Sequence, residues 1–409
     1  MKSTRKSSRQ HHQGHFIFPD NLDYECITCG ACCRRDWKIY IDLRSYSNLK
    51  DSDTCRKIQQ KHNGQELFFL DIKNSECTIR KIDGLCPMME DNLCVIHREM
   101  GFDAKPVPCR YFPHIMAVTP DGTYVGLSFN CPGVTFSSTG YQPGENEIPR
   151  LKDILRDSSD CRCGFGDVAI FGDITTDWEG YRVIEQHVID SLNRGGSISR
   201  NLWDIMMKIM NTCHTLKQES RGKISARELS ELLDMPFSPP FERDQDYRGY
   251  EYFYAMYLVA LAESPEAQDR KPNLQALQQG GDFISTTFKG TIQVENLAEF
   301  LHQKALKGDD MKQTEYFKHL IWRKELLKIS NIVVSLATLS LLKIVLDWYY
   351  YNSALTGNIP KPDEADYSIA IREVEEMLKH DTNHVIRNQA LEFAGNIYTQ
   401  LEMFLEPET

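Results

Sequence analysis

The sequence lacks the hydrophobic segments that would place a protein in or across a membrane. No apolar signal stretch follows Met1. The longest apolar run, Ile332 to Leu346, is interrupted by Lys343 and is shorter than the ~20 residues of a membrane helix. We therefore expect a cytoplasmic protein with no membrane span, in which this run forms a buried core helix.

Positive charge and familiar catalytic motifs are also scarce. The net charge is −11 and the isoelectric point is near 5.6, which argues against general binding of nucleic acid. Residues 1–15 form a locally basic tail that we expect to be disordered. The sequence has no G-x-S-x-G nucleophile motif and no C-x3-C-x2-C motif for a radical cluster. Gly164-Phe165-Gly166 is expected to be a turn rather than a nucleotide loop.

Cysteine, in contrast, is abundant and crowded. Four of the thirteen cysteines lie within eight residues, and ten of them occur by Cys131. Crowded thiols oxidise and mispair unless something holds them, and thiolates two residues apart are a common device for metal sites. A disulfide framework and scattered buried thiols are the alternatives, but disulfide frameworks belong to short secreted chains. The pattern therefore predicts a metal ion or an iron-sulfur cluster in a reducing cytoplasm.

Eight cysteines are candidate ligands, because they form the opening cluster or lie mainly in loops beside proline, whose fixed backbone can aim a sulfur. They are Cys26, Cys29, Cys32, Cys33, Cys86, Cys94, Cys109 and Cys131. Cys161 and Cys163 are possible extra ligands. The remaining thiols have no partner at ligand spacing and are expected to be structural: Cys55, Cys77 and Cys213.

Adjacent cysteines cannot easily point at one tetrahedral centre, so Cys32 and Cys33 are expected to differ in role. Either one is a ligand and the other a packed thiol, or they bind two centres. The opening motif alone offers too few well-spaced sulfurs for a closed site. We therefore predict that Cys26, Cys29 and one of the pair share a centre with at least one of the four later candidates.

Residues beside the cysteines bear on the charge of such a site. Four thiolates around zinc or a [4Fe-4S] core leave about two negative charges. Arg34, Arg35 and Arg110 could offset them, or could be solvated surface charges. His97 follows Cys94 at C-x2-H spacing, which is only half a zinc site, so we expect a satisfied, partly buried histidine.

The predicted fold class is α+β, with a small cysteine-rich, metal-stabilised N-terminal domain followed by a mainly α-helical C-terminal domain. The expected bounds are 16–140 for the cysteine-cluster domain, 141–175 for a connector folded against it, and 176–409 for the helical domain. Alternation predicts a strand over Trp37–Asp42, with Trp37, Ile39 and Ile41 on one face. Ile115–Val118 and Tyr124–Phe129 are expected to pair across a turn at Thr119–Gly122.

Helical spacing dominates the C-terminal part. The expected helices are Tyr181–Leu192, Ile198–Leu216, Ser225–Leu233, Tyr250–Ala262, Val294–Ala305, Glu315–Trp348, Ile369–Leu378 and Ala390–Leu405. Ser225 and Glu228 form the signature of a capping box. The consecutive aromatic residues Trp348 to Tyr351 point around a whole helix, so not all can face one core, and some could contact a peptide or small-molecule substrate.

In these motifs the chain resembles the YkgJ-type cysteine-cluster family of zinc- or iron-chelating proteins. The resemblance covers roughly residues 22 to 133 and lies in Cys26 to Cys33, Cys86 to His97, Cys109-Arg110-Tyr111-Phe112-Pro113 and Leu127 to Pro132. It implies a protein that binds a metal or a cluster through these cysteines.

The chain is also similar to the related flagellin lysine-N-methylases. The similar segments are Cys32 to Asp42 and Trp178 to Ile184, followed by helices, but an extra residue separates Cys33 from Trp37. That resemblance implies a [4Fe-4S] cluster, S-adenosylmethionine and a protein lysine as methyl acceptor. If an amine is methylated it must first be neutral, which calls for a nearby tyrosine or carboxylate.

Three functions follow as hypotheses. The first is a metal- or cluster-binding protein with a helical module for a partner or substrate. The second is a cluster-dependent protein lysine N-methylase that uses S-adenosylmethionine. The third is a zinc-stapled scaffold without catalysis. The sequence leaves the oligomeric state and the choice between iron and zinc open.

Overall fold

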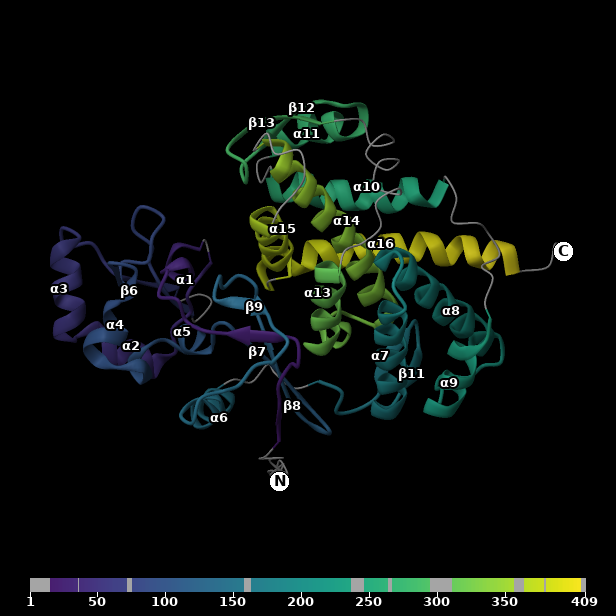
Figure 1. The fold of residues 1–409 in the computed structure, drawn as a ribbon, viewed down its shortest axis with the longest axis horizontal. Helices are drawn as coiled ribbons and strands as arrows, with labels where there is room; N and C mark the ends of the chain where they lie inside the picture. Colours follow the sequence, from purple (N-terminus) through teal and green to yellow (C-terminus); the bar gives the residue numbers. More distant parts are fainter. Residues whose placement is uncertain are drawn as a thin grey trace, which may run out of the picture. The chain divides into compact units, whose positions relative to one another are not determined.

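The chain divides into two compact units, Met1–Cys163 and Gly164–Thr409, in a mixed α+β structure whose C-terminal part is dominated by helices (Figure 1). This computed structural model describes residues 15–35, 37–71, 76–157, 163–236, 246–263, 267–294, 311–356, 364–378 and 380–405. The predicted basic tail lies outside these residues except for its last position. The division falls inside the segment 141–175 that the sequence indicates as a connector.

The first unit contains short strands in small sheets. They are β1 (Phe16–Ile17), β2 (Leu22–Tyr24), β3 (Phe68–Asp71), β4 (Glu76–Ile79), β5 (Met89–Glu90), β6 (Leu93–Cys94), β7 (His114–Thr119), β8 (Gly122–Leu127) and β9 (Val134–Phe136). The largest sheet has the order β1-β8-β7, with β1 parallel to β8. β7 and β8 are antiparallel, with Thr119 opposite Gly122, so the predicted hairpin and its turn are confirmed. The pairs β2-β9, β3-β4 and β5-β6 are antiparallel.

Short helices separate these strands, which the sequence did not indicate. They are α1 (Ala31–Arg34), α2 (Leu43–Lys50), α3 (Asp53–Lys61), α4 (Val95–Met100), α5 (Val107–Tyr111) and α6 (Glu147–Asp157). Side-chain caps begin two of them: Asp42 accepts from the Ser45 amide and Ser52 from the Cys55 amide.

Three hydrophobic clusters form the core of the first unit. The largest collects Ile39, Ile41, Leu49, Cys55, Ile58, Leu67, Cys77, Ile79, Ile82, Cys86, Met88, Val95 and Ile96. Trp37 packs against this cluster, so the predicted face of Trp37, Ile39 and Ile41 does point inward. The segment Trp37–Asp42 does not form the continuous strand that was predicted: Tyr40 makes an isolated bridge to Thr78. In a third cluster Leu151 and Ile154 of α6 pack with Met116 and Val125.

The second unit is a helical bundle with two hairpins. Its helices are α7 (Trp178–Asn193), α8 (Ile198–Gln218), α9 (Ala226–Asp234), α10 (Asp246–Glu263), α11 (Ala267–Gln279), α13 (Met311–Trp322), α14 (Ile332–Thr356), α15 (Glu364–Met377) and α16 (His380–Leu405). The hairpins are β10 (Val168–Phe171) with β11 (Ile174–Thr176), and β12 (Gly281–Ser285) with β13 (Gly290–Val294). α14 contacts α8, α10, α15 and α16 and is the centre of this unit (Figure 1).

The central helix α14 is long and apolar enough over Ile332–Ser353 to cross a membrane, yet this stretch is entirely buried inside the structure. The predicted core helix is thus confirmed. Its two charged residues pair with each other, since Lys343 Nζ lies 2.7 Å from both carboxylate oxygens of Asp347. Gln313 also donates to Asp347, at 3.1 Å. Pairing lets a buried helix carry charge at a tolerable cost.

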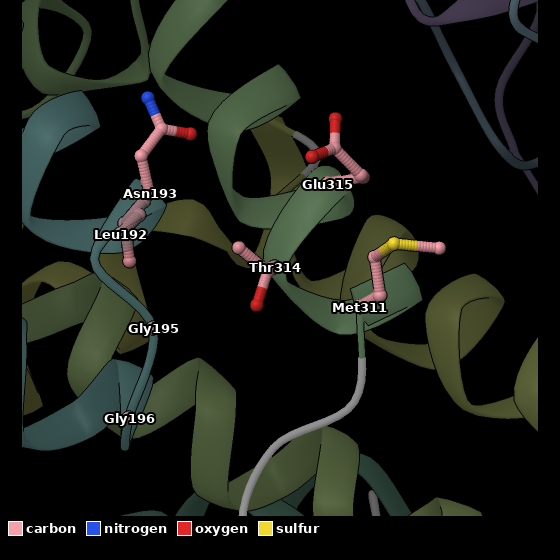
Figure 2. Close-up of a pocket in the computed structure, with 7 residues that line it drawn as sticks. All are labelled: Leu192, Asn193, Gly195, Gly196, Met311, Thr314 and Glu315. Carbon is pink, nitrogen blue, oxygen red and sulfur yellow. The ribbon is translucent and has the colours of Figure 1, made fainter.

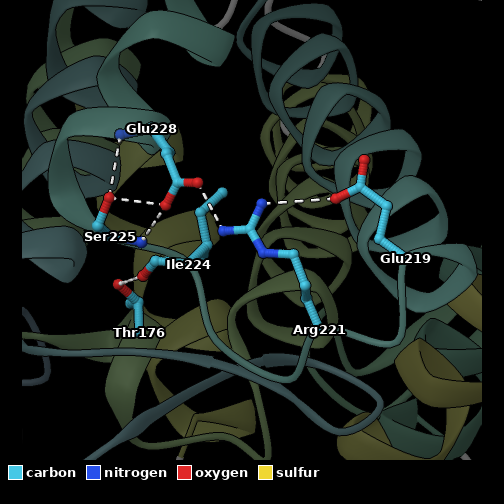
Figure 3. Close-up of polar contacts among 6 residues, drawn as sticks. All are labelled: Thr176, Glu219, Arg221, Ile224, Ser225 and Glu228. Carbon is cyan, nitrogen blue, oxygen red and sulfur yellow. Dashed lines mark hydrogen bonds and ion pairs between the residues drawn. The ribbon is translucent and has the colours of Figure 1, made fainter.

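Polar contacts fix the start of α9, as Figure 3 shows. The Glu228 amide donates to Ser225 Oγ, and Glu228 Oε2 accepts from the Ser225 amide, which confirms the predicted capping box. Arg221 pairs with both Glu228 and Glu219, at 2.5 and 3.5 Å. Thr176 Oγ1 donates to the Ile224 carbonyl and connects this corner to β11.

Two expected helices of the second unit were wrong in part. The segment Glu315–Trp348 is broken into α13 and α14, because Lys324 adopts a left-handed conformation with φ of 62°. Val294 ends β13 instead of starting a helix, and residues 295–310 lie outside the described ones. The β12-β13 turn is held by Glu263 Oε2, which accepts from the Thr286 and Thr287 amides at 2.6 and 3.1 Å.

Candidate metal centre

The opening cysteines lie on a loop that passes close to the turn between β5 and β6. Gly30 has a left-handed φ of 67° and precedes α1, which carries Cys32 and Cys33. A Cβ added at Gly30 would approach the Asn92 backbone and the Met89 sulfur at 3.1–3.2 Å. Because glycine tolerates this conformation and this closeness, it brings the loop against the turn that leads into Cys94.

Backbone hydrogen bonds bring three candidate ligands from separate segments together. The Cys86 amide donates to the Cys33 carbonyl at 3.1 Å, and the Met89 amide donates to the Cys86 carbonyl at 3.1 Å. Met89 is in turn the register partner of Cys94 in the β5-β6 ladder. The three cysteines therefore surround one short stretch of chain, with Cys86 buried and the other two partly buried.

Cys109 of α5 belongs to the same neighbourhood. It is partly buried and packs against the large hydrophobic cluster, as Cys33 and Cys94 do. Burial raises the pKa of the Cys109 thiol to about 12. The charge of Lys105 lowers this pKa, whereas the Cys94 and Cys33 thiols raise it further. The hydrogen bond with Cys32 lowers the pKa of Cys33, but contact with Cys86, burial and the nearby thiols raise it to about 12.

Cys131 lies instead beside the start of the opening motif. The β2-β9 pair continues into a hydrogen bond of 3.2 Å from the Glu25 amide to the Gly133 carbonyl. Cys131 packs against a separate cluster that contains Leu22 and Val134. Burial raises the pKa of the Cys131 thiol to about 11, although a hydrogen bond from the Gly133 amide lowers it. The Cys29 and Cys26 thiols also raise this pKa.

The sulfurs are gathered without converging fully. Within the described ranges, no three side chains of His, Cys, Asp or Glu lie in an arrangement that could hold one metal ion. The Sγ atoms of Cys32 and Cys33 are 4.0 Å apart.

Cations lie beside the thiols as the charge argument requires. Arg34 Nη1 donates to the Cys29 carbonyl at 2.7 Å, and its Nη2 donates to Asn92 Oδ1. Lys105 acts on the pKa of both Cys32 and Cys109, where its charge favours the thiolates. Sequence reasoning missed Lys105, although it stands four residues before Cys109. The arginine beside that cysteine, Arg110, is partly buried on α5.

The other residues singled out in the sequence take varied places. His97 is exposed, not partly buried as expected, and its ring meets Phe102 edge-on at 5.8 Å. Cys163 is partly buried, and its amide donates to the Val118 carbonyl at 3.0 Å. Cys161 lies outside the described residues. The three cysteines expected to be structural are all buried: Cys55, Cys77 and Cys213.

A buried polar network adjoins Cys26, and the sequence gave no sign of it. His114 Nε2 lies 2.9 Å from the Tyr141 hydroxyl and 3.2 Å from Glu147 Oε1. Burial raises the pKa of Glu147, but hydrogen bonds from His114 and Tyr141 outweigh this and lower it. Tyr24 packs edge-on against His114 at 5.7 Å and hydrogen-bonds the Cys26 thiol. Burial, followed by the Cys26 and Cys131 thiols, raises the pKa of Tyr24.

The second unit contains an open pocket of about 320 Å³, shown in Figure 2. The last residues of α7 supply Leu192 and Asn193, and the turn after it supplies Gly195 and Gly196. The first turns of α13 supply Met311, Thr314 and Glu315. Of the four consecutive aromatic residues, Trp348 and Tyr349 are buried, whereas Tyr350 and Tyr351 are partly exposed.

Comparison with known proteins adds one distant relative. The chain is 24% identical over 177 residues to a protein of Methanocaldococcus jannaschii named Uncharacterized protein MJ0939. The match covers 42% of this chain and 60% of that protein, so the chain spans less than two thirds of its relative. No family model matches the chain, and no solved structure matches it.

Proposed function

We propose that the first unit binds a metal ion or an iron-sulfur cluster through its cysteine thiolates, as the resemblance to the YkgJ-type family implies. One observation carries the proposal. Cys33, Cys86, Cys94 and Cys109 come from four separate segments, yet all four lie in or against one hydrophobic cluster, and the Cys86 amide donates to the Cys33 carbonyl at 3.1 Å. Thiols brought together from separate segments are typical of a metal site.

The absence of disulfides among the described residues is consistent with the same proposal. None of the twelve cysteines that the structure describes forms a disulfide, including the adjacent pair Cys32 and Cys33. A disulfide framework would pair them, so the alternative of a secreted, disulfide-linked protein gains no support. The proposal therefore includes a reducing compartment, the cytoplasm, and a metal-stabilised N-terminal domain.

Anaerobic purification followed by analysis of iron, zinc and acid-labile sulfide tests the proposal. A brown protein with iron and sulfide supports a cluster, whereas a colourless protein with stoichiometric zinc supports the zinc-stapled scaffold. Cys26→Ser and Cys29→Ser should lower the bound metal, and Cys213→Ser in α8 is the matched control that should not. Full retention of metal in both loop variants would end the proposal.

A second candidate, the lysine N-methylase, is favoured by Glu147. Methyl transfer to an amine needs a group that accepts its proton, and the Glu147 carboxylate lies 3.2 Å from His114 Nε2 in the network beside Tyr24. Calorimetric titration with S-adenosylmethionine, followed by assay of methylation on lysine peptides, tests this candidate. Glu147→Gln should retain cofactor binding and slow transfer, and a chain that binds no S-adenosylmethionine excludes the activity.

The helical unit is our candidate for binding a protein partner or peptide. Its open pocket and the partly exposed Tyr350 and Tyr351 support this role. Hydrogen exchange measured with and without a methylated or unmethylated lysine peptide should show protection at the start of α13. Unchanged exchange throughout the unit would count against it.

A further inference from the structure

Three basic side chains from separate segments gather around the ring of Phe102. Lys105 Nζ lies 5.2 Å from the centre of this ring, and the guanidinium carbon of Arg150 lies 4.5 Å from it. The ring of His97 meets the Phe102 ring edge-on, with 5.8 Å between the two centres. His97 belongs to α4, Lys105 follows the 3-10 turn Phe102–Ala104, and Arg150 belongs to α6. The fold therefore brings a basic cluster of His97, Lys105 and Arg150 to one place in the first unit.

The charges of this basic cluster repel one another. Because both permanent cations lie within 5.2 Å of one ring centre, they are no farther apart than about 10 Å. This separation is comparable with the screening length of ~8–10 Å at physiological ionic strength, so salt removes only part of the repulsion. The face of Phe102 attracts each cation but has no net charge, and it cannot neutralise them.

No carboxylate compensates the basic cluster within the part of the chain that the structure describes. None of its three side chains belongs to an ion pair there, whereas the neighbouring Arg98 pairs with Glu90 at 2.6 Å. A carboxylate close to His97 would raise the pKa of its imidazole. Burial, Lys105 and Arg150 instead all lower that pKa. The positive charge of the cluster is therefore left for a ligand to balance.

We infer that the basic cluster is a binding site for a small oxyanion that carries at least two phosphate or carboxylate groups. This inference goes beyond the proposed metal binding and does not depend on it. Arginine offers a planar fork of donors to such groups, and lysine offers a point charge. A molecule with two anionic groups can reach both cations, because a charge-assisted hydrogen bond adds ~2.8 Å at each end.

The charge of the whole chain favours a small ligand. The net charge of −11 repels a long polyanion such as a nucleic acid, whereas a small anion meets mainly the local field of the cluster. Lys105 also opposes the rise in the pKa of the Cys32 and Cys109 thiols, so the anion would lie beside the cysteines. Arg150 lies on α6, outside the cysteine segments, and can therefore be changed to test the anion site separately from metal binding.

Calorimetric titration of the full-length protein as purified with pyrophosphate, and separately with succinate, tests the inference. Arg150→Gln should weaken binding by ~10-fold or more, because it removes a charged hydrogen-bond donor. Lys152→Gln is the matched control, since it removes one positive charge from an exposed position on the same helix. Residues two positions apart on a helix point ~200° apart, so this variant should bind like the wild type. Tighter binding of pyrophosphate than of succinate identifies phosphate as the preferred group, and the reverse identifies carboxylate.

Several results overturn the inference. They are equal affinity of the wild type and Arg150→Gln, equal weakening in Arg150→Gln and Lys152→Gln, and binding of a single-stranded oligonucleotide without binding of either small probe. Metal content measured on the same samples keeps the two proposals apart. A protein that contains metal but binds neither probe leaves the proposed function standing, and a protein without metal that binds a probe through Arg150 leaves the inference standing.

Chemical modification of the unmutated chain avoids any variant that fails to fold. Phenylglyoxal adds to accessible guanidinium groups, and mass spectrometry of peptides identifies the modified arginines. Saturating pyrophosphate or succinate should slow the modification of Arg150 at least several-fold and leave that of Arg44, an exposed arginine of the same unit, unchanged. Protection of neither arginine, or of both to the same extent, contradicts a site at Arg150.

Discussion

Gly133 offers a way to displace Cys131 without touching a thiol. Its position is buried, and a Cβ added there would meet the Glu25 carbonyl oxygen well inside 3.0 Å, a distance that real Cβ atoms essentially never reach. The same glycine accepts the 3.2 Å hydrogen bond from the Glu25 amide that joins this turn to the opening motif. Gly133→Ala must therefore separate the turn that follows Cys131 from Glu25, the residue that precedes the opening motif.

The size of the effect follows from these two contacts. Overpacking of a well-filled site costs ~1–3 kcal/mol, and a lost backbone hydrogen bond costs ~0.5–1.5 kcal/mol. Together they should lower the free energy of unfolding of the first unit by ~1.5–4.5 kcal/mol. In a unit of this size each kcal/mol lowers Tm by about 2–4 °C, so the expected drop is roughly 3–18 °C.

Gly144→Ala is the matched control, because it makes the same substitution in the same unit with no atom within 4 Å of the new Cβ. Differential scanning calorimetry and metal analysis of both variants provide the assay. Gly133→Ala should have a lower Tm and should lose the metal bound through Cys131. Gly144→Ala should keep the Tm and the metal content of the wild type. Equal Tm and equal metal content in the two variants would refute the reasoning.

Three further predictions concern stability. Lys343→Met leaves the Asp347 carboxylate buried without its cation and should lower the free energy of unfolding in urea by ~3–5 kcal/mol. Lys343→Met/Asp347→Asn should restore much of this stability. A double variant that is no more stable than the single one contradicts the prediction. Ser225→Ala should cost about 1 kcal/mol by removing the cap of α9, and Ser225→Thr should retain most of it; equal losses in the two would exclude the cap as the cause. Chelation should accelerate limited proteolysis within the first unit and spare the second; an unchanged digestion pattern counts against metal as part of the fold.

Sequence patterns predicted the elements whose information is local. The Pro-Asp-Gly turn specified the β7-β8 hairpin, because proline and glycine preset its backbone dihedrals. The capping box marked the start of α9, and the apolar run around Lys343 marked the buried α14. In each case the deciding residues lie within a few positions of one another.

Features that depend on distant partners escaped prediction. The β12-β13 hairpin is held by Glu263, which reaches its turn from α10 across more than twenty residues of sequence. The helix break at Lys324 rests on a left-handed lysine whose Nζ lies 2.8 Å from a carboxylate oxygen of Glu185 on α7. The contacts of Tyr24 with Cys26 and His114 likewise require β2 and β7 to be placed by tertiary structure. No pattern of single residues specifies such contacts.

The candidate site could be predicted only in part, because its ligand types are local in the sequence but their placement is not. Cysteine spacing identified the eight thiols, because a ligand set needs many sulfurs whatever the fold. Their placement depends on turns whose backbone is unusual, with positive φ at Thr28, Gly30, Asp91 and Asn92. Such conformations cost energy in residues other than glycine and persist only where surrounding contacts maintain them. Here those contacts exist: Arg34 joins the Cys29 carbonyl to Asn92, and the hydrophobic clusters pack beneath. The first unit thus has a core of its own, so bound metal would fix the cysteine loops on an existing framework.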